Sequence, residues 1–458
     1  MTGRSYVAPV GSPILVDAIE STMAPRPGAC SAVMGKTLNL STRGLEDFFF
    51  ANWQPPLVDL LFIAAAAEYC DATMRRPARG WARAFDVRVA VHDPSLWNSN
   101  SVRLALEEAL VFLTGDQWSF SFISRQRPEQ DVGRRTLDLG SSVRVIIPYS
   151  DGLDSRAVAA LVRDVERDGA VSVRLGNGGV DRRSHKAFTT VPYRIRFEKR
   201  ERVEASARSR GFKFAAITGI AALLANVSRI VVSESGQGAL GPSLAVSGQI
   251  YPDYRVHPAF TRRMENLFEA LTSKKLRYEY PRIWSTKGET LRAANELANP
   301  PSWTDSRSCW QSSRQVGFQG HRRQCGICAA CLLRRLSLST AGIAESSDAY
   351  IWENLSAPSI MDGVAKGFGR ITRAQEEYAI AGVLHLDHLA ALPNSPLHQR
   401  MLKRAARELA DALNEQENDA ERKLMSLLSR HKEEWLSFLG TLGSQSFVSK
   451  IALVSPWR

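Results

Sequence analysis

The amino-acid sequence predicts an α/β fold, with a parallel sheet that is covered by helices on both faces. From residue 143 onward, short apolar segments of strand length alternate with segments of helical periodicity. The strand segments are apolar throughout, which is typical of strands buried on both faces of a parallel sheet. A polar turn joins the first of these strands directly to a helix, at the sheet edge where such folds place their ligands.

The elements follow one another in a regular order. In the main region we expect strands at 143–148, 171–175, 193–197 and 229–233, and helices at 156–167 and 212–225. Ahead of it, a front module mixes helices at 57–67 and 102–113 with strands at 84–91 and 118–122. Near the end, leucines at helical spacing predict two amphipathic helices, at 399–414 and 420–439.

These elements divide the chain into four parts. Residues 1–40 are rich in Pro, Gly, Ser and Ala, and we expect a flexible, loosely held arm. Residues 41–135 are expected to form an N-terminal α+β module, residues 141–345 the α/β domain, and residues 346–458 a helical C-terminal region. The helical region is interpreted as a packing domain, with a helix pair that docks a partner as the alternative.

Composition and charge narrow the class of protein. The 458 residues are 44% hydrophobic and 23% charged, as in soluble globular proteins. The most apolar short window, 60–67, is too short to cross a bilayer, so we expect a cytoplasmic protein with no membrane segment. The net charge of +12 favours an anionic partner without naming it. The densest basic region, 182–213, contains few aromatic residues, so nucleic-acid binding stays open but is not favoured.

The turn at 149–155, Tyr-Ser-Asp-Gly-Leu-Asp-Ser, is a candidate phosphate-binding loop. Ser150 and Ser155 offer hydroxyls, Gly152 allows close approach of backbone N–H groups, and the helix that follows adds its positive dipole end. The alternative is an ordinary turn, because Ser, Asp and Gly also cap helices. The negative charge of Asp151 must face away from a phosphate or meet a bound Mg²⁺. The candidate nucleotide-binding residues are Ser150, Asp151, Gly152, Leu153, Asp154 and Ser155.

Four of the six cysteines lie in one short segment, 309–331. Their positions are Cys309, Cys325, Cys328 and Cys331. Four thiolates at this spacing suit a closed tetrahedral zinc site that orders a loop. An iron–sulfur cluster and thiols without a metal remain alternatives. His321 lies inside the segment and is not needed as a ligand.

The loop pattern S-x-G-x-D-S resembles the PP-loop of ATP pyrophosphatases, the adenine nucleotide alpha hydrolase-like fold. Together with the later cysteines, residues 143–345 resemble the 7-cyano-7-deazaguanine synthases (QueC) of queuosine biosynthesis. Three further stretches carry this resemblance. Residues 208–212 match an arginine-containing loop, residues 251–255 match Y-P-D-C-R with Tyr254 in place of the cysteine, and residues 285–289 match a T-K-A-E element.

The resemblance implies ATP, Mg²⁺ and Zn²⁺ as cofactors and a deazaguanine carboxylate as substrate. The family activates that carboxylate as an adenylate before it joins an amine. The loop with Asp154 would hold phosphates and magnesium, and Lys287 and Arg210 would neutralise developing charge. Asp253 and Arg255 would contact the base or its carboxylate. The alternatives are an exposed helix-terminal lysine at Lys287 and a local salt bridge between Asp253 and Arg255.

Residues 233–240 and 257–260 resemble the enlarged synthase-like proteins of bacterial antiphage systems, the Qat and CBASS-associated types. This resemblance adds Glu234 and His257 to the expected substrate residues, and it extends to the front module around Asp71, Arg75, Trp81 and Trp97. It implies that the amine acceptor is a partner protein from the same operon instead of ammonia. A homodimer is left open.

Two other functions remain in view from the sequence. A PP-loop enzyme that modifies tRNA would also use ATP, zinc and positive charge. Alternatively, Asp151 disables the loop, and the chain is a nucleotide-binding subunit of a defence complex.

Overall fold

We describe a computed structural model of the chain. The structure describes residues 11–40, 54–77, 80–126, 142–150, 152–174, 187–188, 192–246, 251–304, 306–309, 311, 316–369 and 371–453. The chain divides into two compact units. Unit 1 comprises Met1–Tyr149, Glu166–Val232 and Asp253–Glu279, and unit 2 comprises Ser150–Val165, Ser233–Pro252 and Tyr280–Arg458.

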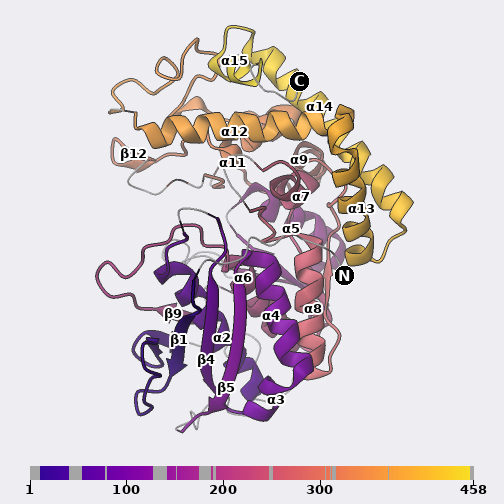
Figure 1. The fold of residues 1–458 in the computed structure, drawn as a ribbon. Coiled ribbons are helices and arrows are strands. Elements are labelled where there is room, and N and C mark those ends of the chain that lie inside the picture. Colours follow the sequence, from indigo (N-terminus) through magenta and orange to yellow (C-terminus); the bar gives the residue numbers. More distant parts are fainter. Residues whose placement is uncertain are drawn as a thin grey trace. The chain divides into compact units, whose positions relative to one another are not determined.

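Unit 1 begins with a four-stranded parallel sheet in the order β2-β1-β4-β5. Figure 1 shows β1, β4 and β5 of this sheet side by side. Its strands are β1 (Ile14–Ile19), β2 (Cys30–Val33), β4 (Ala84–Val91) and β5 (Gln117–Ser124). Its helices are α2 (Pro55–Thr73), α3 (Pro94–Asn98) and α4 (Asn100–Thr114). Helix α2 is buried over nearly its whole length, as expected for a helix that is apolar on every side.

The expectation of a loosely held arm over residues 1–40 is wrong for the described part, 11–40. Strand β1 pairs with β2 on one side and β4 on the other, and Val16 and Ala18 are fully buried. Pro25, Pro27 and Gly28 lie between β1 and β2, and Gly11 and Pro13 lie directly before β1. The composition of the whole segment therefore concealed a six-residue apolar strand.

A second parallel sheet has the order β11-β10-β6-β7-β8. Its strands are β6 (Val145–Tyr149), β7 (Ala170–Arg174), β8 (Ala187–Phe188), β10 (Arg229–Val231) and β11 (Arg277–Glu279). Helices α6 (Arg210–Leu224) and α8 (Pro258–Thr272) and the 3₁₀ turn η1 (Arg167–Gly169) also belong to unit 1. The prediction of parallel strands with helices is confirmed.

The strand order reverses between β6 and β10, because β7 and β8 continue on one side while β10 and β11 lie on the other. Parallel α/β sheets bind ligands beyond the carboxyl ends of the two strands at such a reversal. The expected strand at 193–197 forms in part, as β9 (Tyr193–Ile195). It pairs antiparallel with β3 (Leu38–Leu40) rather than joining the parallel sheet.

Unit 2 is mainly helical. It contains most of α5 (Leu153–Glu166), then α7 (Gly236–Leu244), α9 (Lys287–Asn295), α11 (Ala329–Thr340), α12 (Arg373–Ala391), α13 (Gln399–Leu413), α14 (Glu417–Leu442) and α15 (Phe447–Leu453). Short elements are the hairpin β12 (Gly317–Phe318) and β13 (His321–Arg322), and the turns η2 (Ser347–Ala349), η3 (Leu392–Asn394) and η4 (Pro396–His398). The two amphipathic helices expected near the end are confirmed as α13 and α14.

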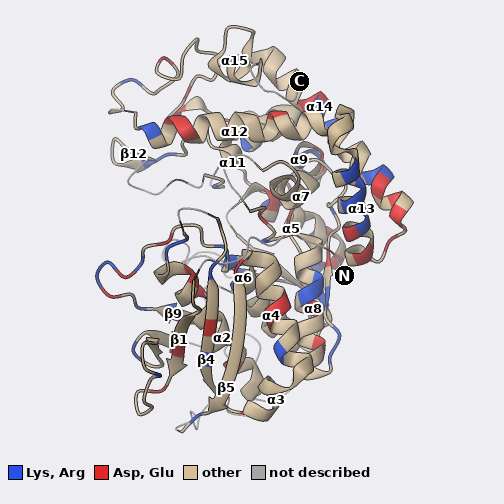
Figure 2. Cartoon of the chain, viewed as in Figure 1, with Lys and Arg blue, Asp and Glu red and all other residues tan. Residues whose placement is uncertain are grey.

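One large apolar core joins the cysteine segment to the C-terminal helices of unit 2. Trp352 and Trp435 are fully buried in it, together with residues of α11, α12, α14 and α15. The ribbon in Figure 2 shows positions of basic and acidic residues interspersed along α13 and α14. Pairs such as Arg407 and Glu417, 3.0 Å apart, join opposite charges there. The charge on these helices is therefore largely a solvated face.

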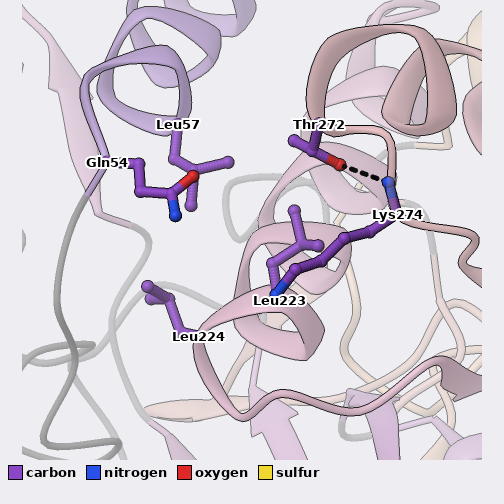
Figure 3. A pocket seen from close by; sticks show the side chains of 6 residues that line it. All are labelled: Gln54, Leu57, Leu223, Leu224, Thr272 and Lys274. Atoms are coloured by element: carbon purple, nitrogen blue, oxygen red, sulfur yellow. Dashed lines mark hydrogen bonds between the residues drawn. The ribbon is translucent and has the colours of Figure 1, made fainter.

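A small pocket in unit 1 carries none of the residues expected to function. Figure 3 shows its lining, which comes from the beginning of α2, the end of α6 and the end of α8. The lining residues are Gln54, Leu57, Leu223, Leu224, Thr272 and Lys274. Lys274 is its single charged residue, and its backbone N–H donates to Thr272 Oγ1 at 3.3 Å. We therefore assign the pocket no function. Over the described ranges, none of the helices combines the length and apolar character that a bilayer crossing requires.

Candidate functional site

A short loop connects the first strand of the second sheet to a helix. Strand β6 ends at Tyr149 and α5 begins at Leu153. Within the loop, Ser150 Oγ lies 2.9 Å from Ser155 Oγ, and the N–H of Gly152 donates to Ser150 Oγ at 3.3 Å. Hydroxyls and a backbone N–H therefore converge at the start of α5, as the loop pattern predicted. Such groups can hold a phosphate.

Asp151 and Leu153 differ from the other residues expected in the loop. Asp151 lies outside the described residues. The side chain of Leu153 is buried against Ala157 and Leu291 in an apolar cluster. Leu153 could therefore contact a nucleotide only through its backbone.

A second loop, after β10, contributes to the same place. Ser233 Oγ lies 3.2 Å from Ser155 Oγ, and the N–H of Ser235 donates to Asp154 Oδ1 at 3.3 Å. The Oγ of Ser235 is buried and, within the described ranges, has no hydrogen-bond partner. Because β6 and β10 are neighbouring strands, the loops that follow them meet.

Sequence reasoning did not assign Ser233 or Ser235 to the candidate phosphate site. The available signal was the segment Ser-Glu-Ser-Gly-Gln-Gly at 233–238, which also lies between a strand and a helix. It repeats the small and hydroxyl character of the first loop. Glu234 belongs to this loop, and its carboxylate lies against Gly238, where an added Cβ would come 2.5 Å from Oε2.

Lys287 is the charged partner of the first loop. Its Nζ lies 2.5 Å from Asp154 Oδ2, and both residues are buried, with 7% and 6% of their surface exposed. Lys287 begins α9, whose N-cap Thr286 forms a capping box with Glu289. The alternative of an exposed helix-terminal lysine is therefore wrong. The site pairs a carboxylate with an ammonium group at the point where phosphates could bind.

The expected substrate residues of unit 1 form an arginine-rich group. Asp253 accepts bonds from the guanidinium of Arg255, including one of 2.9 Å, and Arg208 Nη1 lies 3.6 Å from its carboxylate. Burial alone would raise the pKa of Asp253, but the positive charges of Arg255 and Arg208 outweigh it and hold that pKa below its usual range. The alternative of a local salt bridge between Asp253 and Arg255 is confirmed. It leaves an excess of positive charge around one carboxylate.

Arg210 and His257 differ in how they are held. Arg210 is exposed, and its guanidinium lies 4.8 Å from the ring centre of Phe214. Arg210 forms no ion pair within the described ranges, although the charges of Glu68 and Asp253 act on it from farther away. His257 is buried and caps α8, because its Nδ1 accepts from the N–H of Ala259 at 3.2 Å. Nδ1 of His257 is therefore used as the acceptor that caps α8.

The front sheet's helix α2 fixes the arginine loop from within unit 1. Asp71 accepts from the backbone N–H of Ser209 at 2.8 Å and from its hydroxyl at 3.0 Å. Arg83 Nη2 forms an ion pair with Asp71 Oδ1 at 2.7 Å, and the guanidinium carbon of Arg208 lies 5.0 Å from the ring centre of Trp81. Asp71 and Trp81, which the sequence placed in the front module, therefore position the residues that begin α6.

The four cysteines form one compact cluster. Their Sγ atoms all lie within 4.8 Å of one another, and those of Cys325 and Cys331 are 3.7 Å apart. Tetrahedral zinc bonds of about 2.3 Å place ligand sulfurs about 3.8 Å apart. These distances fit a single metal ion. A cluster of several iron atoms would hold the thiolates farther apart.

Backbone geometry supports the same interpretation. The N–H of Cys325 donates to Cys309 Sγ at 3.2 Å, and the N–H of Cys328 donates to Cys325 Sγ at 3.3 Å. Gly326 has φ +92°, and an added Cβ would lie 2.9 Å from Trp352 O, so only glycine fits this turn. Donation to sulfur favours thiolates, the form that binds a metal. His321 is exposed on β13 and lies outside the cluster.

The comparisons with known proteins agree with these features. Residues 234–342 match QueC, the queuosine biosynthesis protein. The match runs from the second serine loop through Lys287 and the cysteines to the end of α11, and it covers less than half of the chain. No curated protein and no solved structure gave a significant match.

The QueC match indicates an ATP-dependent enzyme of the PP-loop type, related to those of queuosine biosynthesis. The candidate phosphate-binding loop at 150–155 lies before the QueC match, so its interpretation rests on the sequence pattern and on the contacts of Ser155 and Asp154. Tyr254, which stands where QueC proteins have a cysteine, is buried against Phe112 and His257, with ring centres 4.6 and 5.3 Å away.

Proposed function

We propose that the chain is a QueC-like ATP-dependent ligase that adenylates a 7-deazaguanine-type carboxylate and passes it to an amine. The observation that carries this proposal is the convergence of Ser150, Ser155 and Ser233 beside the buried pair of Asp154 and Lys287. This set provides phosphate donors, a cation and a metal-binding carboxylate. The QueC match supplies the class of reaction.

The loop residues have distinct roles in this proposal. The hydroxyls of Ser150 and Ser155 hold the outer phosphates of ATP, together with the N–H groups at the start of α5. Lys287 neutralises charge that develops on the phosphates. Asp154 fits Mg²⁺, a hard cation that proteins bind through one or two carboxylates and the substrate's phosphates. Magnesium would supply further charge neutralisation there.

The reaction then has two steps. A carboxylate oxygen of the deazaguanine attacks the α-phosphorus of ATP, and the bond to pyrophosphate breaks. The amine nitrogen next attacks the acyl carbon, the bond from carbon to AMP breaks, and the amine loses a proton to solvent. The first step replaces hydroxide, a poor leaving group, with AMP, a good one. For this reason activation precedes amide formation.

The arginine group of unit 1 is the proposed recognition site for the substrate's carboxylate. Arg210 forms no ion pair in the described part of the chain, and Arg255, whose Nε and Nη2 already bond to Asp253, adds positive charge beside it. Asp253 would accept bonds from the base. Glu234 and His257 are proposed as further substrate contacts.

The acceptor is proposed to be an amine of a partner protein from the same operon, with ammonia as the alternative. The motive is the size of the chain, since the front module and the helices beyond residue 345 exceed what nitrile synthesis requires. Antiviral defence in the cytoplasm is the proposed setting. The net charge of +12 would assist docking of an acidic partner.

The metal of the cysteine cluster is proposed to be zinc. Four thiolates leave no open coordination position, so the ion would fold the segment and take no part in catalysis. The QueC match includes all four cysteines.

Pyrophosphate exchange tests the proposal directly. With 7-carboxy-7-deazaguanine present, the chain should exchange labelled pyrophosphate into ATP, and mass spectrometry should then detect a conjugated partner protein or a free amide. Absence of substrate-dependent exchange would contradict adenylation. Free 7-cyano-7-deazaguanine with an unmodified partner would return the chain to ordinary nucleoside synthesis. Exchange that requires tRNA would favour the tRNA-modifying alternative.

A further inference from the structure

Helix α14 lies beyond the QueC match, yet its residues reach the backbone of Lys287. The link is the side chain of Gln237, which is 2% exposed. Its Oε1 accepts from the N–H of Lys287 at 2.7 Å. Its Nε2 donates to His431 Nδ1 at 2.8 Å and lies 3.2 Å from Glu434 Oε2. Both of these acceptors belong to α14.

His431 determines how Gln237 is oriented. Its Nε2 donates to the carbonyl of Leu386 at 2.9 Å, so Nδ1 is left as an acceptor. Burial lowers the pKa of His431 to about 4, so the ring stays neutral at physiological pH. Gln237 must then present its amide nitrogen to His431 and its oxygen to Lys287. The orientation of one side chain thereby fixes a backbone N–H at the site.

Glu434 makes a second connection, through Thr286. Thr286 Oγ1 donates to Glu434 Oε1 and also accepts from the N–H of Glu289 at 3.0 Å. The next residue of α9, Gly288, is closely packed. An added Cβ there would lie 2.6 Å from Thr340 Cγ2 and 3.1 Å from Glu434 Oε1. The first turn of α9 is therefore held against α11 and α14, with little freedom to shift.

We propose that α14 is a positioning element of the nucleotide site, in which Glu434 and His431 act through Thr286 and Gln237 to hold Lys287 at Asp154. The inference rests on the proposed role of Lys287 in binding ATP. The helical C-terminal region thus serves the ATP site in addition to packing. In this proposal Glu434 and His431 act through Thr286 and Gln237 and not on the nucleotide, so both are positioning residues.

A double-mutant cycle on ATP affinity tests this coupling. The probe is Mg-ATP, and its dissociation constant is measured by calorimetry on the full chain. Lys287→Ala should weaken binding by about tenfold to a hundredfold, and Glu434→Ala by on the order of tenfold. If Glu434 acts through Lys287, the double variant should bind no more weakly than Lys287→Ala alone. Additive losses would overturn the inference.

Two further variants separate positioning from general damage. Glu433→Ala removes an exposed carboxylate one residue earlier on α14 and should leave ATP affinity unchanged. Glu434→Gln keeps an acceptor for Thr286 and should regain part of the affinity that Glu434→Ala loses. If Glu434→Ala does not fold, the same cycle with Glu434→Gln decides the question.

The outcomes also distinguish this inference from the proposed function. If the chain binds Mg-ATP and the double-mutant cycle shows coupling between Lys287 and Glu434, but no adenylation occurs, the positioning role is supported and the ligase is contradicted. If adenylation occurs and the losses of ATP affinity in the two single variants add up in the double variant, the ligase is supported and the positioning role is overturned. A chain that does not bind Mg-ATP at all would overturn both.

Discussion

Lys287 and Asp154 form a buried ion pair in which the ammonium nitrogen lies 2.5 Å from the carboxylate oxygen Oδ2. One residue begins α9 and the other lies in the first turn of α5, so the pair joins two helices of unit 2. Each charge compensates the other in the absence of nucleotide. Removing one partner of such a pair leaves an uncompensated buried charge, which costs about 3–5 kcal/mol.

Lys287→Met should therefore both destabilise the chain and abolish pyrophosphate exchange. The double variant Lys287→Met/Asp154→Asn should regain most of the free energy of unfolding, because no charge is left unpaired. Its exchange activity should stay lost, because the phosphate-binding cation is still missing. Urea unfolding and exchange assays measure the two effects separately. Recovery of exchange in the double variant would exclude a direct role for Lys287.

The serine loop predicts a loss of nucleotide binding with little loss of stability. Ser155→Ala removes a hydroxyl that lies between Ser150 and Ser233. We expect a fall in pyrophosphate exchange of about tenfold to a hundredfold, the typical value of a hydrogen bond to a charged group. Ser302→Ala, at an exposed hydroxyl, is the matched control. Equal activity of the two variants would contradict phosphate binding by the loop.

The arginine group predicts a separate effect on the carboxylate substrate. Arg210 is exposed and forms no ion pair in the ranges that the structure covers, so Arg210→Ala should change stability little. It should raise the KM for the deazaguanine carboxylate by about tenfold and leave the affinity for Mg-ATP unchanged. Arg202→Ala, another exposed arginine of unit 1, should change neither. A change in ATP affinity with an unchanged KM would reassign Arg210 to the nucleotide.

The cysteine cluster predicts one tightly bound metal ion per chain. Elemental analysis should find zinc, and Cys328→Ser should lose it and lower the melting temperature. Cys30→Ser, outside the cluster, should retain the metal. Visible absorbance typical of thiolate-bound iron in the purified chain would contradict zinc.

The raised pKa of Glu434 predicts that the stability of the chain depends on pH. Burial is the main cause that raises its pKa to about 7, with a smaller contribution from Glu289, while Thr286, Gln237 and Arg292 act in the opposite direction. The folded chain thus keeps a proton on Glu434 that the unfolded chain releases near pH 4.5. Stability should therefore fall as pH rises from about 4.5 to about 7.

Glu434→Gln should remove that contribution. Relative to the unchanged chain, the variant should gain stability at pH 8 compared with pH 5, by on the order of 1–3 kcal/mol. Urea unfolding at the two pH values measures the difference. An identical pH dependence in both proteins would show that Glu434 titrates normally.

Local patterns in the sequence predicted the parts of the site that are close together along the chain. The loop from Ser150 to Ser155 and the cysteine triplet at 325–331 each lie within seven residues, so spacing alone constrains their geometry. The buried Lys287 was expected through a family resemblance, but its pairing with Asp154 could not be predicted from spacing. Strand β1 was missed because only six residues carry its pattern within a segment rich in Pro and Gly.

The sequence by itself determined the α/β class, the serine-containing turn before α5, the spacing of the four cysteines and the amphipathic C-terminal helices, because each depends on neighbouring residues. Only the tertiary structure decided that Ser233 joins Ser155 and that Glu434 bonds to Thr286, residues 78 and 148 positions apart. Such contacts follow from strand order and helix packing, since β6 and β10 must be neighbours before their loops can meet. Helical spacing shows which face of α14 is buried, and packing alone decides what that face touches.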